Sequence, residues 1–409
     1  MSDEAIEGEK PSTGKWFIPS LVVSFLAVGV STPILMLLTL DIAETFQVPF
    51  GVAAQLSTIN SIAEVIISLL MGFLAIRFKH KSLLLSGVAL VAASAVGAFF
   101  APTLELMLFF FALEGAGTVM VGVMGLTLIG DLLPLSKKAK AVSYVIATTY
   151  LTAIVGVAAI GFIANVAGWR SVFSLFVLPV SIAGLALAFL SLPYRSREES
   201  VAIGRKAYLS AFKQVLLNRS AVACLVGSML MSVMSLALFT TGFFREQLSA
   251  SRDVAAVIIM MAASMYVVAA LVTGRLINIF GRKTLTVTGV LGSSILAMLI
   301  FFMPNLWLAV IVDMIHVWFA AVGITAFSCY ALEQVPKSRS TMMSLRSIFN
   351  EMGGAIGAAL GGALLILFAY NLSLSYQTVG IAFGAIGISA SAVFYFLTKD
   401  PTKPKIAVH

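Results

Sequence analysis

The chain has 409 residues, of which 60% are hydrophobic and only 11% are charged. A soluble domain of this length needs far more polar surface to cover its core, so the composition excludes an ordinary water-soluble protein. The net charge of +8 does not indicate a nucleic-acid partner, because the basic residues stand mostly in short turns between apolar runs.

Apolar runs of about twenty residues or more recur from one end of the chain to the other, and each is long enough to cross a bilayer as a helix. We therefore expect an all-α polytopic membrane protein with twelve transmembrane helices. The predicted spans are residues 16–40, 51–76, 82–102, 105–132, 141–166, 171–193, 219–244, 252–278, 284–304, 306–332, 342–370 and 376–398. The predicted domains are a tail at 1–15, a six-helix bundle at 16–193, a linker at 194–218, a second six-helix bundle at 219–398 and a tail at 399–409.

Two short basic turns, at residues 72–83 and 274–285, repeat at a fixed distance along the chain. The same offset of 202 residues joins Gly72 to Gly274, Lys81 to Lys283, and Asp131 to Glu333. A constant offset over such a length indicates a duplicated unit, so the two halves are expected to be pseudo-symmetric.

Lysine and arginine are distributed unequally between the two sides of the predicted membrane. The turns, linker and tails on one side hold 23 of the 26 basic residues, and the other side holds Arg170, Arg245 and Arg252. This excess predicts that both termini and the linker face the cytoplasm. Residues 1–15 are polar and acidic, unlike a cleaved signal peptide. We expect a multi-pass protein of the inner or plasma membrane.

Both turns carry most of a motif that is typical of one transporter family. The matching positions are Gly72, Leu74, Ala75, Arg77 and Lys81 in the first turn, and Gly274, Leu276, Gly281, Arg282 and Lys283 in the second. Asp131 and Glu333 each precede a proline and a basic residue, and Gly168-Trp169-Arg170 lies between spans 5 and 6. On these marks the chain resembles the major facilitator superfamily of secondary transporters, most of all its bacterial and archaeal 12-span branch that exports drugs or organic solutes.

The resemblance implies alternating access, with cytoplasmic gating at the turns. The gating residues that it implies are Gly72, Arg77, Lys81, Asp131, Gly274, Arg282, Lys283, Glu333 and Arg339. The chain departs from the family pattern at Ile76 and Asn278, which replace an acid, and we hypothesise that Asp131 pairs with Arg77 instead. The marks of proton antiporters are also incomplete, since Phe111 and Glu114 stand where those proteins have arginine and glutamine.

Four ionisable residues lie well inside predicted spans, where a charged group is expensive and usually functional. They are Glu64, Glu114, Asp313 and His316. The offset of 202 relates Glu114 to His316, and Phe111 to Asp313. Because spans 1, 4, 7 and 10 line the central cavity in this family, we expect these groups to bind protons or substrate there. Structural alternatives stay open: a static Asp313–His316 pair, a Glu114 that accepts from a Ser or Thr of a neighbouring span, and a structural Glu64.

The leading hypothesis is a proton-coupled exporter of small cationic or neutral amphipathic compounds. A symporter or uniporter for a metabolite is the first alternative, and a non-transporting sensor or assembly protein on the same fold is the second. An anionic substrate is disfavoured, because no Lys or Arg stands in the middle of a predicted span. The sequence shows no nucleotide-binding loop, metal cluster or nucleophile triad, so we expect no enzyme activity, cofactor or catalytic metal. The expected partners are the lipid bilayer, protons and a small-molecule substrate, and the expected state is a monomer.

Overall fold

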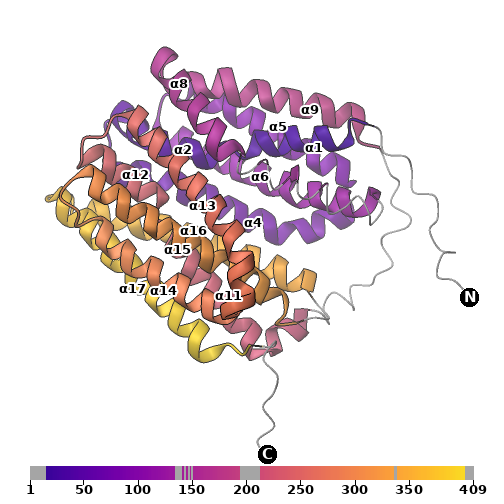
Figure 1. The fold of residues 1–409 in the computed structure, drawn as a ribbon. Coiled ribbons are helices and arrows are strands. Elements are labelled where there is room, and N and C mark those ends of the chain that lie inside the picture. Colours follow the sequence, from indigo (N-terminus) through magenta and orange to yellow (C-terminus); the bar gives the residue numbers. More distant parts are fainter. Residues whose placement is uncertain are drawn as a thin grey trace, which may run out of the picture. The chain divides into compact units, whose positions relative to one another are not determined.

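The computed structural model of the protein describes residues 15–133, 141, 144, 145, 148, 151–193, 212–335 and 339–400, and these residues are almost entirely helical (Figure 1). Eleven of the described helical segments are long and apolar enough to cross a membrane, and Thr152–Ala167 is a shorter apolar segment. The predicted all-α membrane fold of twelve spans in two halves is confirmed. The predicted domain boundaries stay a prediction, because residues 1–14, 194–211 and 401–409 lie outside the described ones.

The first compact unit comprises residues up to Ile34 together with Ile66–Val201. Its helices are α1 (Phe17–Val28), α5 (His80–Phe100), α6 (Leu104–Leu132), the π-helical η1 (Thr152–Gly156), α8 (Val157–Ala167), the π-helical η2 (Phe173–Val177) and α9 (Leu178–Ser191). The chain passes from one unit to the other inside α2 (Ser31–Phe46) and α4 (Gln55–Arg77).

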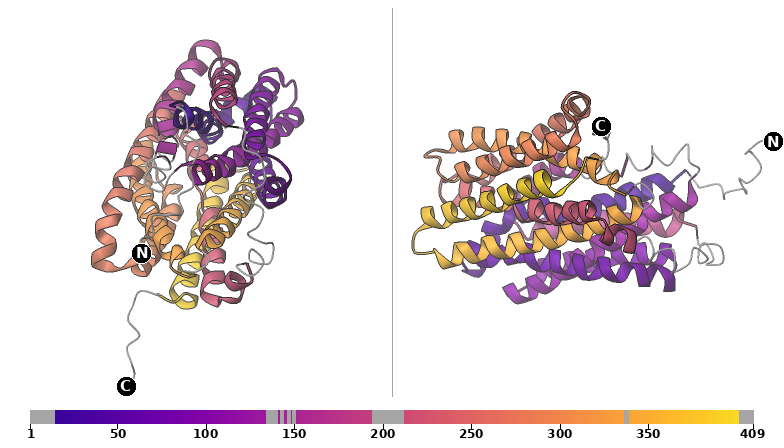
Figure 2. Two further views of the ribbon diagram at one scale, coloured as in Figure 1. Left: turned by 90° about the vertical axis from the view of Figure 1, so that its right-hand side faces the viewer. Right: turned by 90° about the horizontal axis from the view of Figure 1, so that it is seen from below.

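The second compact unit comprises Leu35–Val65 together with Ala202–His409. Its helices are α3 (Phe50–Ala53), α11 (Arg219–Val233), α12 (Ala237–Glu246), α13 (Arg252–Phe280), α14 (Arg282–Ile300), α15 (Leu306–Leu332), α16 (Arg339–Leu367) and α17 (Leu372–Leu397). Within this unit α14 and α17 lie side by side, as Figures 1 and 2 both show.

Glycines let two equivalent helix pairs pack closely, one pair in each unit. A Cβ atom added to Gly117 of α6 would lie 2.5 Å from the carbonyl oxygen of Gly87 on α5. A Cβ added to Gly289 of α14 would lie 2.6 Å from the Cα of Gly323 on α15. Gly87 and Gly289 are again 202 residues apart. Close backbone contact through small residues is the usual way in which membrane helices associate, and here the duplication has kept it.

Two of the predicted spans are interrupted near the middle. Span 1 is divided between α1 and α2 at Gly29 and Val30, and span 7 is divided between α11 and α12 at residues 234–236. In span 1 the cause is local, because Pro33 has no N–H to donate to the preceding turn. Broken membrane helices expose backbone and side-chain polar groups where they line a cavity.

Candidate functional site

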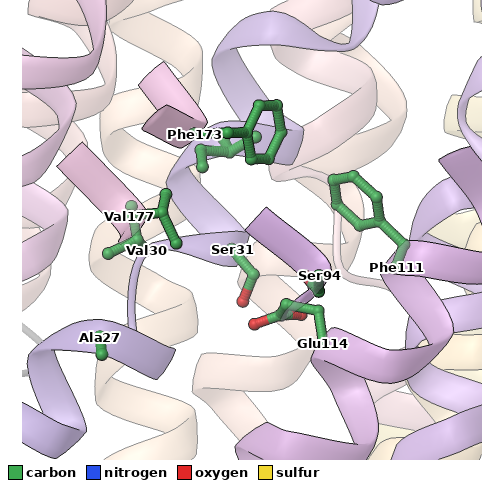
Figure 3. Close-up of a pocket in the computed structure, with 9 residues that line it drawn as sticks. Ala27, Val30, Ser31, Ser94, Phe111, Glu114, Phe173 and Val177 are labelled. Carbon is green, nitrogen blue, oxygen red and sulfur yellow. The ribbon is translucent and has the colours of Figure 1, made fainter. Parts of the chain in front are cut away.

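A pocket in the first unit surrounds the break in span 1. Glu114 lies on its wall with only 6% of its surface exposed. The pocket is lined by Ala27, Val30, Ser31, Ile34, Ser94, Phe111, Glu114, Phe173 and Val177. Figure 3 shows the carboxylate of Glu114 pointing into the pocket toward the side occupied by Ser31. Glu114, predicted to lie deep in span 4, thus lines a pocket together with two serine and two phenylalanine side chains.

Local backbone irregularities bring these side chains together. The break after Val28 ends α1, so that Val30 and Ser31 face the pocket from the bend. Phe173 and Val177, which also line the pocket, are the first and last residues of the π-helical turn η2. Single π-helical turns inside longer helices are common at functional sites, because they redirect side chains out of the regular helical pattern.

The Glu114 carboxylate is held from its own helix. The hydroxyl of Thr118, one turn further along α6, donates to Oε1 of Glu114 at 2.9 Å. The structural alternative raised from the sequence was a hydroxyl donor on a neighbouring span, whereas Thr118 is on α6 itself, so that alternative stays a prediction. Thr118 fixes the carboxylate without removing it from the pocket wall.

Asp313 of α15 is the second deeply placed carboxyl group, with 6% of its surface exposed. Its helix neighbours Val310 and Met314 belong to an apolar cluster. Within the described part of the chain, Asp313 takes part in no hydrogen bond and no ion pair. An ionised carboxylate at such a place lacks the compensation that buried charges normally have.

His316 shares α15 with Asp313 and is equally buried, but it is bonded to a different helix. Its Nδ1 atom lies 2.9 Å from the backbone oxygen of Ser293 on α14. Since a carbonyl oxygen only accepts, Nδ1 carries the proton in this contact. The static Asp313–His316 pair considered from the sequence does not form. The Nδ1–H of His316 donates to the backbone oxygen of Ser293, and Asp313 has no hydrogen-bond or ion-pair partner in the described chain.

The four ionisable residues predicted to share a central cavity are divided between the two units. Glu64 lies on α4 with an intermediate exposure. Glu114 belongs to the first unit, whereas Asp313, His316 and Glu64 belong to the second. That all four face one central cavity therefore remains a prediction.

The turn residues make an equivalent side-chain contact in each unit. Nδ1 of His80 lies 3.0 Å from Oδ2 of Asp131 in the first unit, and Arg282 pairs with Glu333 in the second. His80 and Arg282 are 202 residues apart, as are their acidic partners. The structure therefore corrects the hypothesis that Asp131 pairs with Arg77: the partner is His80, and Arg77 is exposed at the end of α4. Arg77 ends α4, and the offset of 202 residues relates it to Ile279, whereas the residue related to Arg282 is His80.

The lysines of the two turns make equivalent hydrogen bonds in both units. Nζ of Lys81 donates to the backbone oxygens of Phe189 and Leu192, at 2.7 and 2.5 Å. Nζ of Lys283 donates to those of Tyr395 and Thr398, at 2.9 and 2.6 Å. Each lysine thus satisfies unpaired carbonyl groups at the C-terminal end of the last helix of its half, α9 or α17.

Other gating positions implied by the resemblance are less informative. Gly274 lies within α13, and a Cβ added there would meet no atom within 4 Å. Gly72 lies within α4. Arg339 begins α16, but its side chain lies outside the described residues, as do Pro134 and Pro336.

Two sets of basic residues were missed or misplaced by sequence reasoning. Arg346 is among the 23 basic residues assigned to the cytoplasmic turns, linker and tails, but it lies inside α16 with its guanidinium 5.0 Å from the centre of the Phe327 ring. Arg245 and Arg252 were counted only for topology, yet both bind Asp41. Only three basic residues lie on the side of the predicted membrane opposite the two tails, and this scarcity could have drawn attention to Arg245 and Arg252.

The comparison with known families decides the relationship. The family model described as Major Facilitator Superfamily matches residues 20–244 and 221–408, which together cover nearly the whole chain. The chain belongs to the major facilitator superfamily. No curated protein matches it in a sequence search.

Solved structures of other members share the superfamily fold. A D-xylose-proton symporter is 15% identical, with a TM-score of 0.78 over 95% of this chain and 98% of the other. The nucleoside transporter NupG is 13% identical, with a TM-score of 0.75 over 94% and 99%. A bacterial homologue of the human lysosomal transporter Spinster, solved in an inward-facing and unoccupied conformation, is 15% identical, with a TM-score of 0.72 over 95% and 98%. At these identities the likeness concerns the superfamily fold, and the superfamily supports secondary transport.

Proposed function

We propose that this major facilitator superfamily member is a proton-coupled transporter that exports small cationic or neutral amphipathic compounds. One observation carries the proposal: Asp313 is buried in α15 without a hydrogen-bond or ion-pair partner in the described chain. A group in this position needs a proton or a cation to compensate its charge, and a site that loads and unloads a proton is what coupling requires. In this proposal Asp313 carries the proton, and His316 lies one turn away on the same helix.

The Glu114 pocket is proposed as the substrate subsite. A carboxylate beside two serine hydroxyls provides charge and hydrogen bonds for the polar end of a substrate. The rings of Phe111 and Phe173 provide apolar contact, and aromatic faces also attract organic cations.

A second candidate is proton-driven uptake of a neutral metabolite. The observation that favours it is the pair of hydroxyl groups, Ser31 and Ser94, beside Glu114, which suits a polyhydroxylated ligand. The structure titled as a D-xylose-proton symporter shares the fold, so an importer is compatible with this architecture.

For either direction of transport, the proposal also includes a location in the cell membrane with both termini cytoplasmic, and a monomer as the transporting unit.

The deciding experiment uses the purified protein in liposomes with an internal pH dye. Organic cations, sugars, nucleosides and amino acids are added in turn with an imposed pH gradient of either sign. The export proposal predicts that a cationic or amphipathic compound moves against the proton flow and that Glu114→Gln abolishes this movement. A sugar or nucleoside that moves together with protons would establish the second candidate instead, and substrate movement with no proton signal would contradict both.

A further inference from the structure

Arg346 is a cation inside an apolar helix, α16, that is long enough to cross the membrane. It lies about 10 Å along the helix axis from Arg339, where α16 begins. Within the described part of the chain, Arg346 takes part in no hydrogen bond and no ion pair. A charged side chain at such depth is expensive and usually marks a binding site or a pathway.

The neighbours of Arg346 leave its hydrogen-bond donors unused. The guanidinium lies over the ring of Phe327, 5.0 Å from its centre, and Phe327 is 0% exposed. An aromatic ring attracts the face of a guanidinium, whereas the N–H donors of arginine lie in the guanidinium plane. Tyr266 of α13 is close enough to interact electrostatically with Arg346, but it is not the carboxylate that normally compensates a buried arginine. The planar fork of donors therefore stays open toward a ligand.

Carboxylate and phosphate groups are the ligands that fit this fork. Arginine binds each of them through two parallel hydrogen bonds, and its charge does not depend on pH in the physiological range. An anion at Arg346 would thus supply the charge compensation that the described side chains around it do not supply.

Further polar groups follow on the same face of α16. Asn350 is one helical turn beyond Arg346, and Gly354 is one turn beyond Asn350. A Cβ added to Gly354 would lie 3.6 Å from Oγ of Ser61 on α4 and 3.7 Å from Oγ of Ser232 on α11. Neither serine hydroxyl takes part in a hydrogen bond within the described residues. The line from Arg346 to Gly354 is about 12 Å long, so it suits a compound that is larger than a bare inorganic anion.

Glu351 gives this line of polar groups a direction. Its Oε1 atom accepts from Nδ2 of Asn350 at 3.4 Å, and it lies three residues before Gly354. Its negative charge repels an anionic group from the Gly354 end, whereas Arg346 attracts one at the other end. The arrangement thus favours a ligand with its anionic group at Arg346 and its hydroxyl groups near the two serines.

The internal duplication does not reproduce these polar groups. The offset of 202 residues relates Arg346 to Tyr144 and Ser232 to Val30. The lysines that bind the ends of α9 and α17, by contrast, occur in both units. A guanidinium found in one half only is not required by the fold that the two halves share, and this favours a ligand over a packing role.

We propose that α16 carries a binding site for a small hydroxylated organic anion, such as a phosphorylated or carboxylated sugar. Arg346 binds the phosphate or carboxylate group of this ligand. Asn350, Ser61 and Ser232 bind its hydroxyl groups. The site belongs to the second unit, whereas the Glu114 pocket belongs to the first. It goes beyond the proposed function, which assigns no anion to the protein.

The test measures equilibrium binding by isothermal titration calorimetry on the full-length protein in phosphatidylcholine nanodiscs. The probes are glucose 6-phosphate and gluconate, and glucose and inorganic phosphate are the matched controls. Each of the two hydroxylated anions should bind at least about tenfold more tightly than either control, because each control lacks one half of the recognised chemistry. Failure of both hydroxylated anions to bind the unchanged protein would overturn the proposal, and so would equal affinity for inorganic phosphate and glucose 6-phosphate.

Substitutions then assign the binding to Arg346. Arg346→Gln should weaken the binding of glucose 6-phosphate at least about a hundredfold, because two charge-assisted hydrogen bonds are lost. Arg346→Lys should weaken it about tenfold, since an ammonium group keeps the charge but lacks the planar fork. Ser232→Ala should weaken glucose 6-phosphate binding and leave that of inorganic phosphate unchanged. Arg275→Gln, which removes an exposed cation of α13, is the control and should change neither affinity.

Unchanged affinity in both Arg346 variants would overturn the assignment. If Arg346→Gln does not fold, Arg346→Lys alone decides, because it preserves the charge and most of the packing. The titration is repeated in nanodiscs that contain phosphatidylglycerol. Loss of glucose 6-phosphate binding there would show that a lipid phosphate occupies Arg346, and would overturn the assignment to a soluble anion. The titrations need no proton gradient and no transport, so they can fail while the proposed function holds, and the reverse.

Discussion

Lys81 should contribute measurably to the stability of the last helix of the first unit. Lys81 is 5% exposed, and its ammonium group donates to two carbonyl oxygens at the end of α9. A hydrogen bond from a charged group contributes about 1.5–3 kcal/mol. We take the lower end for both bonds because a helix end can recruit water, which gives about 3 kcal/mol for Lys81→Met, or roughly a hundredfold in the opening equilibrium of the last turn.

Amide hydrogen exchange of the detergent-solubilised protein tests this directly. Lys81→Met should reduce the protection of the last turn of α9 by roughly a hundredfold, and Lys283→Met should do the same to the last turn of α17, because the two caps are equivalent. Lys79→Met is the control, since Lys79 is exposed and precedes α5. Unchanged exchange in both α9 and α17 would refute the capping interpretation and return the two lysines to a role in gating alone.

Two further predictions concern the His80–Asp131 contact and the packing of α6 on α5. Asp131→Asn and His80→Ala should be non-additive in a double-mutant cycle on conformational stability, with a coupling of about 0.5 kcal/mol or more, whereas Asp131→Asn and Arg77→Ala should add; the reverse pattern would restore Arg77 as the partner. Gly117→Ala should lower stability by about 1–3 kcal/mol through overpacking against the Gly87 carbonyl. Gly122→Ala on the same helix, where an added Cβ meets nothing within 4 Å, should be nearly neutral; equal thermal stability of the two variants would contradict the packing argument.

The fold could be predicted almost completely from the sequence because hydropathy and the repeat act over long stretches. Apolar length identifies each span, and the offset of 202 residues shows that the chain is duplicated. The offset also holds at the level of single contacts, since it relates the His80–Asp131 pair to Arg282–Glu333. The Arg77 hypothesis failed because it considered charge and membrane side but not the equivalent position in the second half.

The site was harder to predict, because it depends on local breaks in regular helices. Pro33 accounts for the break in span 1, but no sequence pattern indicated the π-helical turn that brings Phe173 into the Glu114 pocket. Spacing on a helix predicted that Asp313 and His316 share a face, yet it could not show that His316 bonds to Ser293 on the next helix. Likewise Asp41 drew no attention, because it was placed just beyond the predicted end of span 1.

The central claim is that Asp313 links proton movement to substrate movement, and Asp313→Asn tests it most directly. Once a substrate is identified, its exchange between the two sides of a liposome with equal pH is compared with its accumulation under an imposed pH gradient. The account predicts that the variant still exchanges substrate, because the Glu114 pocket is intact, but no longer accumulates it and no longer moves protons. Accumulation at the rate of the unchanged protein would contradict the account.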